Sequence, residues 1–245
     1  MKPYDNSFIL NVIAEYLQII KEQKNNNYSV IKQTATVDEG YMYKEKEEKK
    51  YEEIVLLKDT ECVMKINVKE IQGSYTAINS AHGKVGVVGL GLGYVVQEMA
   101  KNTKVKSITV YENSHEVIEI YKNNFKDNSK INIVEQNAFE AEPEEFDYFF
   151  VDIYGYELID KVVEDYKKFM ELHEIEEYSF WGMEHFLLSC AYEDLLWIYV
   201  PENWVEDSKK IYEALDLTRL MDRYYPLDSE FVRDILMKFK VILNE

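Results

Sequence analysis

The chain has 245 residues, of which 47% are hydrophobic, 14% aromatic and 30% charged. This length and composition are those of an ordinary globular protein with a full hydrophobic core, so extended disorder is excluded. The 46 acidic residues outnumber the 28 lysines and arginines, which gives a formal net charge of −18. Because so acidic a surface repels phosphate groups, we expect neither a nucleic acid nor an anionic membrane as a partner.

The basic and metal-binding residues support the same exclusions. The arginines are confined to positions Arg219, Arg223 and Arg233, so most of the chain lacks a guanidinium group for phosphate recognition. Cys62 and Cys190 are too few for a disulfide framework, and no histidine has metal-ligand spacing, so we expect no metal site. The chain has neither a signal-peptide pattern nor an apolar run of ~20 residues, and we expect a soluble, cytoplasmic protein.

The first 80 residues are expected to form an N-terminal helix followed by a small β-meander. Apolar residues recur at helical spacing from residue 7 to 23, which predicts an amphipathic helix. Short β-rich runs follow at residues 28–35, 51–57 and 62–68. The charges in the run 44–50 (KEKEEKK) alternate in sign, so we interpret it as a solvated hairpin tip or helical turn.

Strand and helix patterns alternate across residues 84–170. The strand-like runs are continuously apolar, which is typical of a parallel sheet covered on both faces. The expected strands are residues 85–88, 107–111, 131–134 and 146–151, and the expected helices are residues 94–102, 114–125 and 158–170. The predicted fold class is therefore α/β, with a doubly wound, mostly parallel sheet.

The last third of the chain is expected to be mainly helical. Residues 175–181 predict a fifth strand. Helical patterns follow at 183–197 and 204–244, with breaks at Pro201 and Pro226. The expected organisation is a helix and meander at 1–80, an α/β domain at 81–200, and a helical extension at 201–245 packed on that domain.

A glycine-rich turn and a later acid form the most informative motif. The apolar strand ends in Gly89, Gly91 and Gly93, and a helix is expected to begin directly after them. Glycines allow positive φ and let a ligand approach the backbone, and the helix N-terminus offers unpaired N–H groups. The next strand ends at Glu112, where a carboxylate can accept hydrogen bonds from both hydroxyls of a ribose.

The glycine spacing distinguishes two classes of nucleotide site. A dinucleotide fold uses G-x-G-x-x-G, but here the third position falls on Tyr94 or on Val96, depending on which glycine is taken first. The observed G-x-G-x-G resembles motif I of class I S-adenosylmethionine (SAM)-dependent methyltransferases. The resemblance covers roughly residues 83–160 and implies a Rossmann-like methyltransferase fold with SAM as the cofactor.

Two further motifs fall in the order of that family. Asn137-Ala138 follows the third strand, where the family has residues that contact the adenine amino group, although asparagine departs from the usual acid. Val151-Asp152-Ile153-Tyr154 ends the fourth strand and is similar to motif IV, beside the transferable methyl group. The cofactor-binding residues that the resemblance implies are Gly89, Leu90, Gly91, Gly93, Glu112, Asn113, Asn137, Ala138 and Asp152.

The expected chemistry is in-line methyl transfer to a small-molecule or protein acceptor. Asp152 is the candidate to orient or deprotonate the acceptor, and Tyr154 is the second candidate catalytic residue. Tyr154 and Tyr156 are expected to line the acceptor pocket. A second polar and aromatic cluster lies at residues 180–187, and its Glu184 or His185 can reach the pocket.

Two alternatives stay open. The chain also resembles spermidine synthase-type aminopropyltransferases, because of its N-terminal β-meander and acidic surface. That family has one acid inside its glycine turn and another just after its fourth strand. In this chain the first position holds Leu92 or Tyr94, and the second holds Gly155 with Tyr156. The other alternative is a catalytically inactive SAM-binding module. Assembly into a homo-oligomer is not decided by the sequence.

Overall fold

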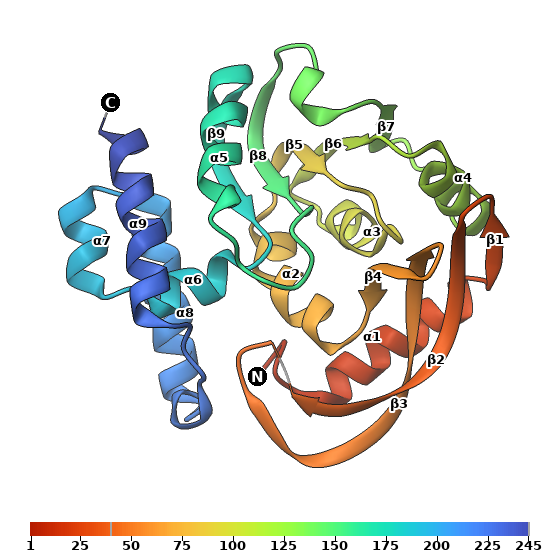
Figure 1. Cartoon of the computed structure of the whole chain (residues 1–245), viewed down its shortest axis with the longest axis horizontal. Helices are drawn as coiled ribbons and strands as arrows, with labels where there is room; N and C mark the ends of the chain where they lie inside the picture. Colours follow the sequence, from red (N-terminus) through yellow and green to blue (C-terminus); the bar gives the residue numbers. More distant parts are fainter. Residues whose placement is uncertain (40, 245) are drawn as a thin grey trace.

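The computed structural model describes residues 1–39 and 41–244, and a five-stranded parallel sheet forms its centre (Figure 1). The strand order is β7-β6-β5-β8-β9, and every neighbouring pair is parallel. The strands are β5 (Gly83–Val88), β6 (Val105–Glu112), β7 (Ile131–Glu135), β8 (Glu145–Val151) and β9 (Glu174–Phe180). The predicted α/β class with a doubly wound parallel sheet is confirmed.

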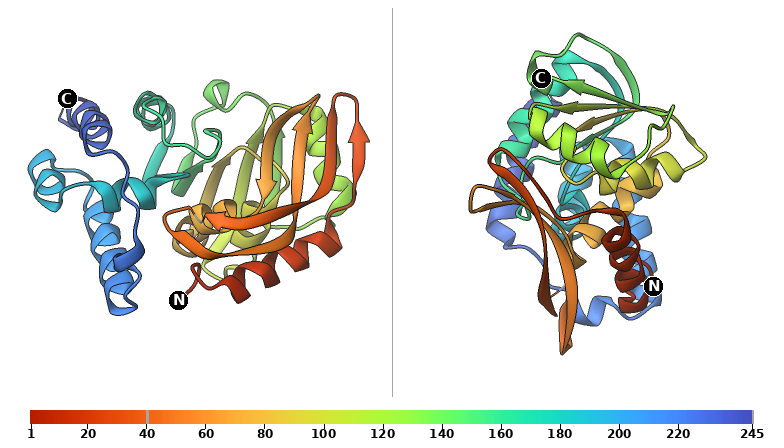
Figure 2. Two further views of the ribbon diagram at one scale, coloured as in Figure 1. Left: turned by 60° about the horizontal axis from the view of Figure 1, so that its bottom comes forward. Right: turned by 90° about the vertical axis from the view of Figure 1, so that its right-hand side faces the viewer.

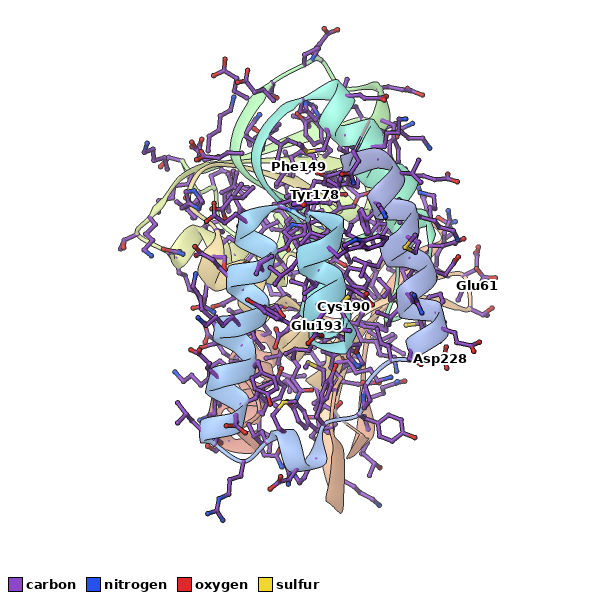
Figure 3. The ribbon with its side chains drawn as sticks, turned by 90° about the vertical axis from the view of Figure 1, so that its left-hand side faces the viewer. Glu61, Phe149, Tyr178, Cys190, Glu193 and Asp228 are labelled. Carbon is purple, nitrogen blue, oxygen red and sulfur yellow. The ribbon has the colours of Figure 1, made fainter. Side chains whose placement is uncertain are left out.

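Helices cover both faces of this sheet because the strand residues are apolar on both sides. Tyr148 and Phe150 belong to the core cluster formed with α2, α3 and α4, whereas Phe149 and Val151 belong to the cluster formed with α5 and α9. Figure 3, seen from the side of the C-terminal helices, labels Phe149 and Tyr178, whose rings stack with centroids 6.1 Å apart. The helices are α2 (Val68–Ser80), α3 (Tyr94–Lys101), α4 (His115–Asn124), α5 (Lys161–Leu172) and α9 (Ser229–Leu243).

The N-terminal part is a helix packed on an antiparallel sheet. Its elements are α1 (Asn6–Ile19), β1 (Gln23–Asn25), β2 (Tyr28–Glu39), β3 (Lys44–Lys58) and β4 (Glu61–Ile66), with the strands in chain order. β2 and β3 form a long curved ribbon beside α1 (Figure 2). The charge run at 44–50 lies within β3 and not in a helical turn or at a hairpin tip, because β2 continues to pair with it, for example at Thr36 and Lys50.

Helix α2 replaces the end of a predicted strand. The expected strand at 62–68 ends at Ile66, because the Asn67 side chain accepts a hydrogen bond from the Glu70 N–H (3.0 Å) and caps a helix. Gly73 in the middle of this helix weakens its sequence signal. A Cβ at Gly73 would lie 2.6 Å from the Trp181 ring, so the packing of α2 against Trp181, which directly follows β9, requires the glycine.

Helices alone follow β9. The predicted helix at 183–197 is divided near Cys190 into α6 (Met183–Ser189) and α7 (Tyr192–Ile198). Pro201 directly precedes α8 (Glu202–Leu217), and Pro226 lies shortly before α9, so both prolines mark breaks as predicted. None of the helices in the described part of the chain has the length and apolar character needed to cross a bilayer.

Substitution of Gly73 tests the packing of α2. We expect Gly73→Ala to lower the free energy of unfolding by about 1–3 kcal/mol, because its Cβ overlaps the Trp181 ring. Helix propensity alone predicts the opposite sign, a gain of up to about 1 kcal/mol. Asn79→Ala, at an exposed position of the same helix, is the control and should not destabilise the protein. Urea denaturation measures both; a stabilised Gly73→Ala variant would contradict the packing.

Candidate functional site

Three strand ends meet at the carboxyl edge of the parallel sheet. Gly89 follows β5, Glu112 ends β6 and Asp152 follows β8. Backbone hydrogen bonds join them: the Gly89 N–H donates to Tyr111 O (3.0 Å), and the Asp152 N–H donates to Val88 O (2.9 Å). The chain runs from β5 outward to β6 and β7 and then returns to β8 on the other side of β5. Open α/β sheets bind ligands at such a switch point.

A cavity of about 260 Å³ lies at this switch point. One wall is the glycine turn with Glu112, Asn113 and Asp152. The N-terminal sheet supplies the opposite wall, through Tyr28, Leu56, Val63 and Met64. The cavity therefore lies between the two sheets, and its volume is just below the range of about 300–1,000 Å³ that is typical of small-molecule pockets.

The glycine turn has the conformation that its sequence predicts. Gly89 and Gly91 have φ values of +96° and +50°, which side chains with a Cβ adopt rarely. A Cβ at Gly91 would overlap the sulfur of Met64, and that sulfur accepts a hydrogen bond from the Leu92 N–H (2.9 Å). The absent Cβ thus gives a sulfur atom direct access to the backbone of the turn.

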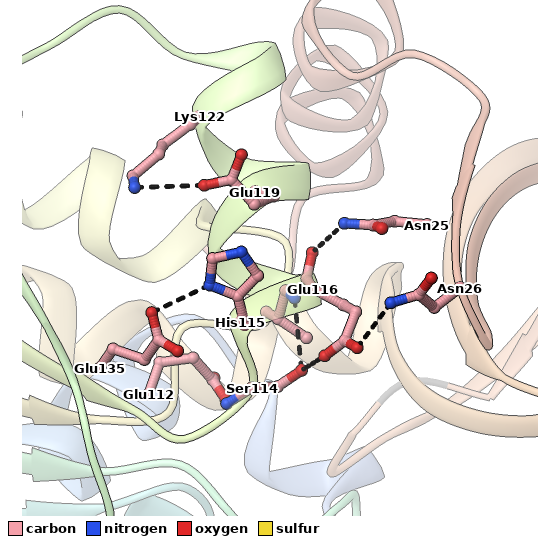
Figure 4. A network of polar contacts seen from close by, with 10 residues as sticks. Asn25, Asn26, Glu112, Ser114, His115, Glu116, Glu119, Lys122 and Glu135 are labelled. Carbon is pink, nitrogen blue, oxygen red and sulfur yellow. Dashed lines mark hydrogen bonds and ion pairs between the residues drawn. The ribbon is translucent and has the colours of Figure 1, made fainter.

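Glu112 holds the turn and the start of α4 together. Its Oε2 accepts from the Leu90 N–H (3.1 Å), and its Oε1 accepts from the Ser114 N–H (2.9 Å). Figure 4 shows how this network continues from Ser114 through Glu116 to Asn26. Each carboxylate oxygen has two lone pairs, so each of the two keeps acceptor capacity toward the cavity.

Glu70 and Asp152 are two further acids of the cavity wall. Glu70 is 2% exposed, and its Oε1 has no hydrogen-bond partner among the described residues. Burial, and then the charge of Asp152, raise the pKa of Glu70 well above its usual value. Burial raises the pKa of Asp152 to about 7. Sequence analysis did not single out Glu70; the N-x-x-E capping pattern that begins at Asn67 is the signal that marks its helix.

The other predicted cofactor residues divide into two groups. Gly89, Leu90, Gly91, Glu112, Asn113 and Asp152 line the cavity together. Gly93, Asn137 and Ala138 do not. Gly93 is the N-cap of α3, and the Asn137 side chain accepts from the Phe139 N–H (3.2 Å), which caps a short 3-10 helix at Ala138–Glu140. Their contacts with a nucleoside stay predictions.

The residues predicted on the acceptor side lie in different parts of the molecule. Tyr156 lines the cavity, and its hydroxyl donates to Lys65 O (2.7 Å). Tyr154 lies instead in the core cluster on the other side of the sheet, so the structure does not place its ring at the cavity. Glu184 accepts from the hydroxyls of Tyr4 and Thr76 (2.5 Å each) and has a structural position away from the cavity. His185 lines a neighbouring cavity and contacts Tyr225 O through Nε2 (2.9 Å).

Within residues 1–39 and 41–244, no group of three or more His, Cys, Asp or Glu side chains is arranged to hold a metal ion.

Neither a protein-family model nor a curated protein matches the chain.

The solved structures similar to the chain include a methyltransferase and spermidine synthases. The 23S rRNA methyltransferase ErmE is 23% identical over 42% of this chain and 40% of its own, with a TM-score of 0.33. Spermidine synthase from Thermotoga maritima is 16% identical over 63% of this chain and 53% of its own, with a TM-score of 0.39. A spermidine synthase in complex with the transition-state analogue AdoDATO has 16% identity and a TM-score of 0.38, over 63% and 52%. The chain thus spans about half or less of each protein's length.

The buried carboxylates predict a pH-dependent stability. A raised pKa in the folded state stabilises the protein below the unfolded pKa of about 4, and this contribution is lost as the pH rises toward 7. Between pH 4 and 8, we expect the free energy of unfolding of Asp152→Asn to fall by about 1–3 kcal/mol less than that of the wild type. Urea denaturation across this range measures it. Asp127→Asn, at an exposed position, should leave the slope unchanged; an equal slope in Asp152→Asn would contradict a buried acid.

Proposed function

We propose that the chain is a SAM-dependent methyltransferase that acts on a small-molecule or protein acceptor. One observation carries the proposal: the glycine turn, Glu112 and Asp152 line a single cavity at the switch point of the parallel sheet. When bound, the cofactor supplies a methyl group on a positively charged sulfur, which is already reactive, so the protein's task is to align and to manage protons.

The residues at the cavity fit an adenosyl group. The free lone pairs of Glu112 can accept hydrogen bonds from ribose hydroxyls, and the Met64 side chain that fills the space beside Gly91 is unbranched and can move aside for a ligand. Asn113 and the apolar side chain of Val117 adjoin Glu112 in the cavity lining and suit a flat, partly polar base.

Asp152 is the residue we assign to proton transfer. With a pKa of about 7, a substantial fraction of this carboxyl is ionised at neutral pH and can accept a proton from a bound acceptor. Tyr156, which lines the same cavity, takes the place that Tyr154 was expected to hold beside the acceptor. The net charge of −18 favours an acceptor that is not a nucleic acid.

Neutralising Glu112 tests the ribose contact. We expect Glu112→Gln to weaken the binding of S-adenosylhomocysteine, the demethylated product, at least tenfold, because charge-assisted hydrogen bonds become neutral ones. Calorimetric titration of the full chain measures the affinity. The matched control is Glu135→Gln, which makes the same change at the paired end of the adjacent strand, outside the cavity. Equal affinities for both variants would contradict the assignment.

An aminopropyltransferase is the second candidate, and the four-stranded N-terminal sheet that walls the cavity favours it. The two functions differ in the donor they bind. We expect SAM to raise the melting temperature more than decarboxylated SAM does, because the backbone of the glycine turn can bind the carboxylate of SAM. A larger shift with decarboxylated SAM would favour aminopropyl transfer. Binding of SAM with no turnover in an acceptor screen would identify an inactive module.

A further inference from the structure

Among the described residues, the lining of the cavity has acids but no cationic side chain to pair with them. Of the described residues that line it, three are carboxylates, namely Glu70, Glu112 and Asp152, and none is a lysine, arginine or histidine. Glu112 satisfies two backbone N–H groups, whereas Glu70 leaves a buried oxygen without a partner. Burying a carboxylate is costly unless it is protonated or paired with a cation. A carboxyl of the pair Glu70 and Asp152 is stable when protonated, and a cationic ligand is the partner that would stabilise it as a carboxylate.

A cluster of aromatic rings adjoins the cavity at Tyr156. The Trp181 ring lies 5.4 Å from the Tyr156 ring and 4.9 Å from the Tyr41 ring, both edge to face. Trp181 also acts on Glu70, since its indole N–H partly offsets the rise in the pKa of that carboxyl. Aromatic faces attract cations, most strongly where water is excluded. Of these three rings, Tyr156 lines the cavity together with the acids, and Trp181 packs on Tyr156 outside the lining.

A second cavity, of about 280 Å³, adjoins the first one at Tyr156. Tyr156 lines both cavities, and the other residues that line the second one are Tyr41, Lys69, Glu157, Leu158, His185 and Leu227. None of these residues belongs to the glycine turn that we assign to the adenosyl group.

We propose that Glu70 and Asp152 bind the methyl acceptor as an ammonium ion, so that the acceptor is a primary or secondary amine. This inference rests on the proposed methyltransferase function. It also gives Glu70, a residue outside the family motifs, a direct role in binding the acceptor.

The proton and charge balance of the reaction agrees with this pair. The ammonium gives one proton to a carboxylate of the pair, which frees the nitrogen lone pair. The nitrogen then forms a bond to the methyl carbon as the bond between carbon and sulfur breaks, and the electrons of that bond stay on sulfur. The amine product is again a cation, the sulfur is neutral, and the carboxylate releases the proton to solvent.

The ammonium of the cofactor's own methionine group is the competing occupant. It has the same charge, but it belongs to a ligand that also contacts Glu112. The two cases are separated by comparing S-adenosylhomocysteine with 5′-methylthioadenosine, which lacks the amino-acid part.

The test uses butylamine and butanol as probes, which have similar size and differ in charge. Binding to the full chain is followed by ligand-observed NMR, without and with S-adenosylhomocysteine. We expect butylamine to bind at least tenfold more tightly than butanol, and Glu70→Gln to remove at least nine-tenths of that preference. The affinity of the variant for S-adenosylhomocysteine should stay within twofold. Glu61→Gln, at an exposed position at the start of β4, is the control and should change neither value.

Two results would overturn the inference. One is an unchanged butylamine affinity in both Glu70→Gln and Asp152→Asn, with melting temperatures that show both variants to be folded. The other is a tenfold loss of S-adenosylhomocysteine binding in Glu70→Gln with unchanged 5′-methylthioadenosine binding, which would assign the pair to the cofactor. Failure of the wild-type chain to bind S-adenosylhomocysteine would instead refute the methyltransferase function, and amine binding measured alone is independent of it.

Discussion

The cost of burying carboxylates between two sheets is the constraint on which the site depends. The parallel sheet brings Glu112 and Asp152 to its carboxyl edge, opposite the N-terminal sheet, where both are half-buried, whereas Glu70 is 2% exposed. Glu112 accepts hydrogen bonds from two backbone N–H groups, whereas Glu70 keeps a buried oxygen with no partner among the described residues. In the absence of a ligand, the pair Glu70 and Asp152 is stable mainly when protonated. Binding of a cation would let the pair ionise, so the ionisation of the two carboxyls and the binding of the ligand are thermodynamically linked.

The N-terminal sheet is accordingly a part of the site and more than an addition to the α/β fold. Met64 of β4 contacts the glycine turn, and Asn67 caps the helix that holds Glu70. The C-terminal helices contribute at the other end, where Trp181 precedes α6 and packs against Gly73. Residues of the N-terminal sheet, α2 and the parallel sheet thus line one cavity, and the C-terminal part supports α2 through Trp181.

The predictable part of the site consists of residues whose position follows from the order of strands. Gly89, Glu112 and Asp152 each end an apolar strand, and parallel strands place their ends together. Glu70 was not predictable in this way, because Gly73 obscures its helix and because only tertiary packing brings α2 to the cavity. The choice between Tyr154 and Tyr156 was also open, since the loop after β8 has no regular period that decides which ring faces inward.

A crystal structure of the full chain with S-adenosylhomocysteine tests the central claim most directly, since it shows where the nucleoside lies. The account predicts the ribose hydroxyls within hydrogen-bond distance of the Glu112 carboxylate and the sulfur between the glycine turn and Asp152. A nucleoside bound elsewhere, with Met64 still against Gly91 and the cavity without ligand, would contradict it.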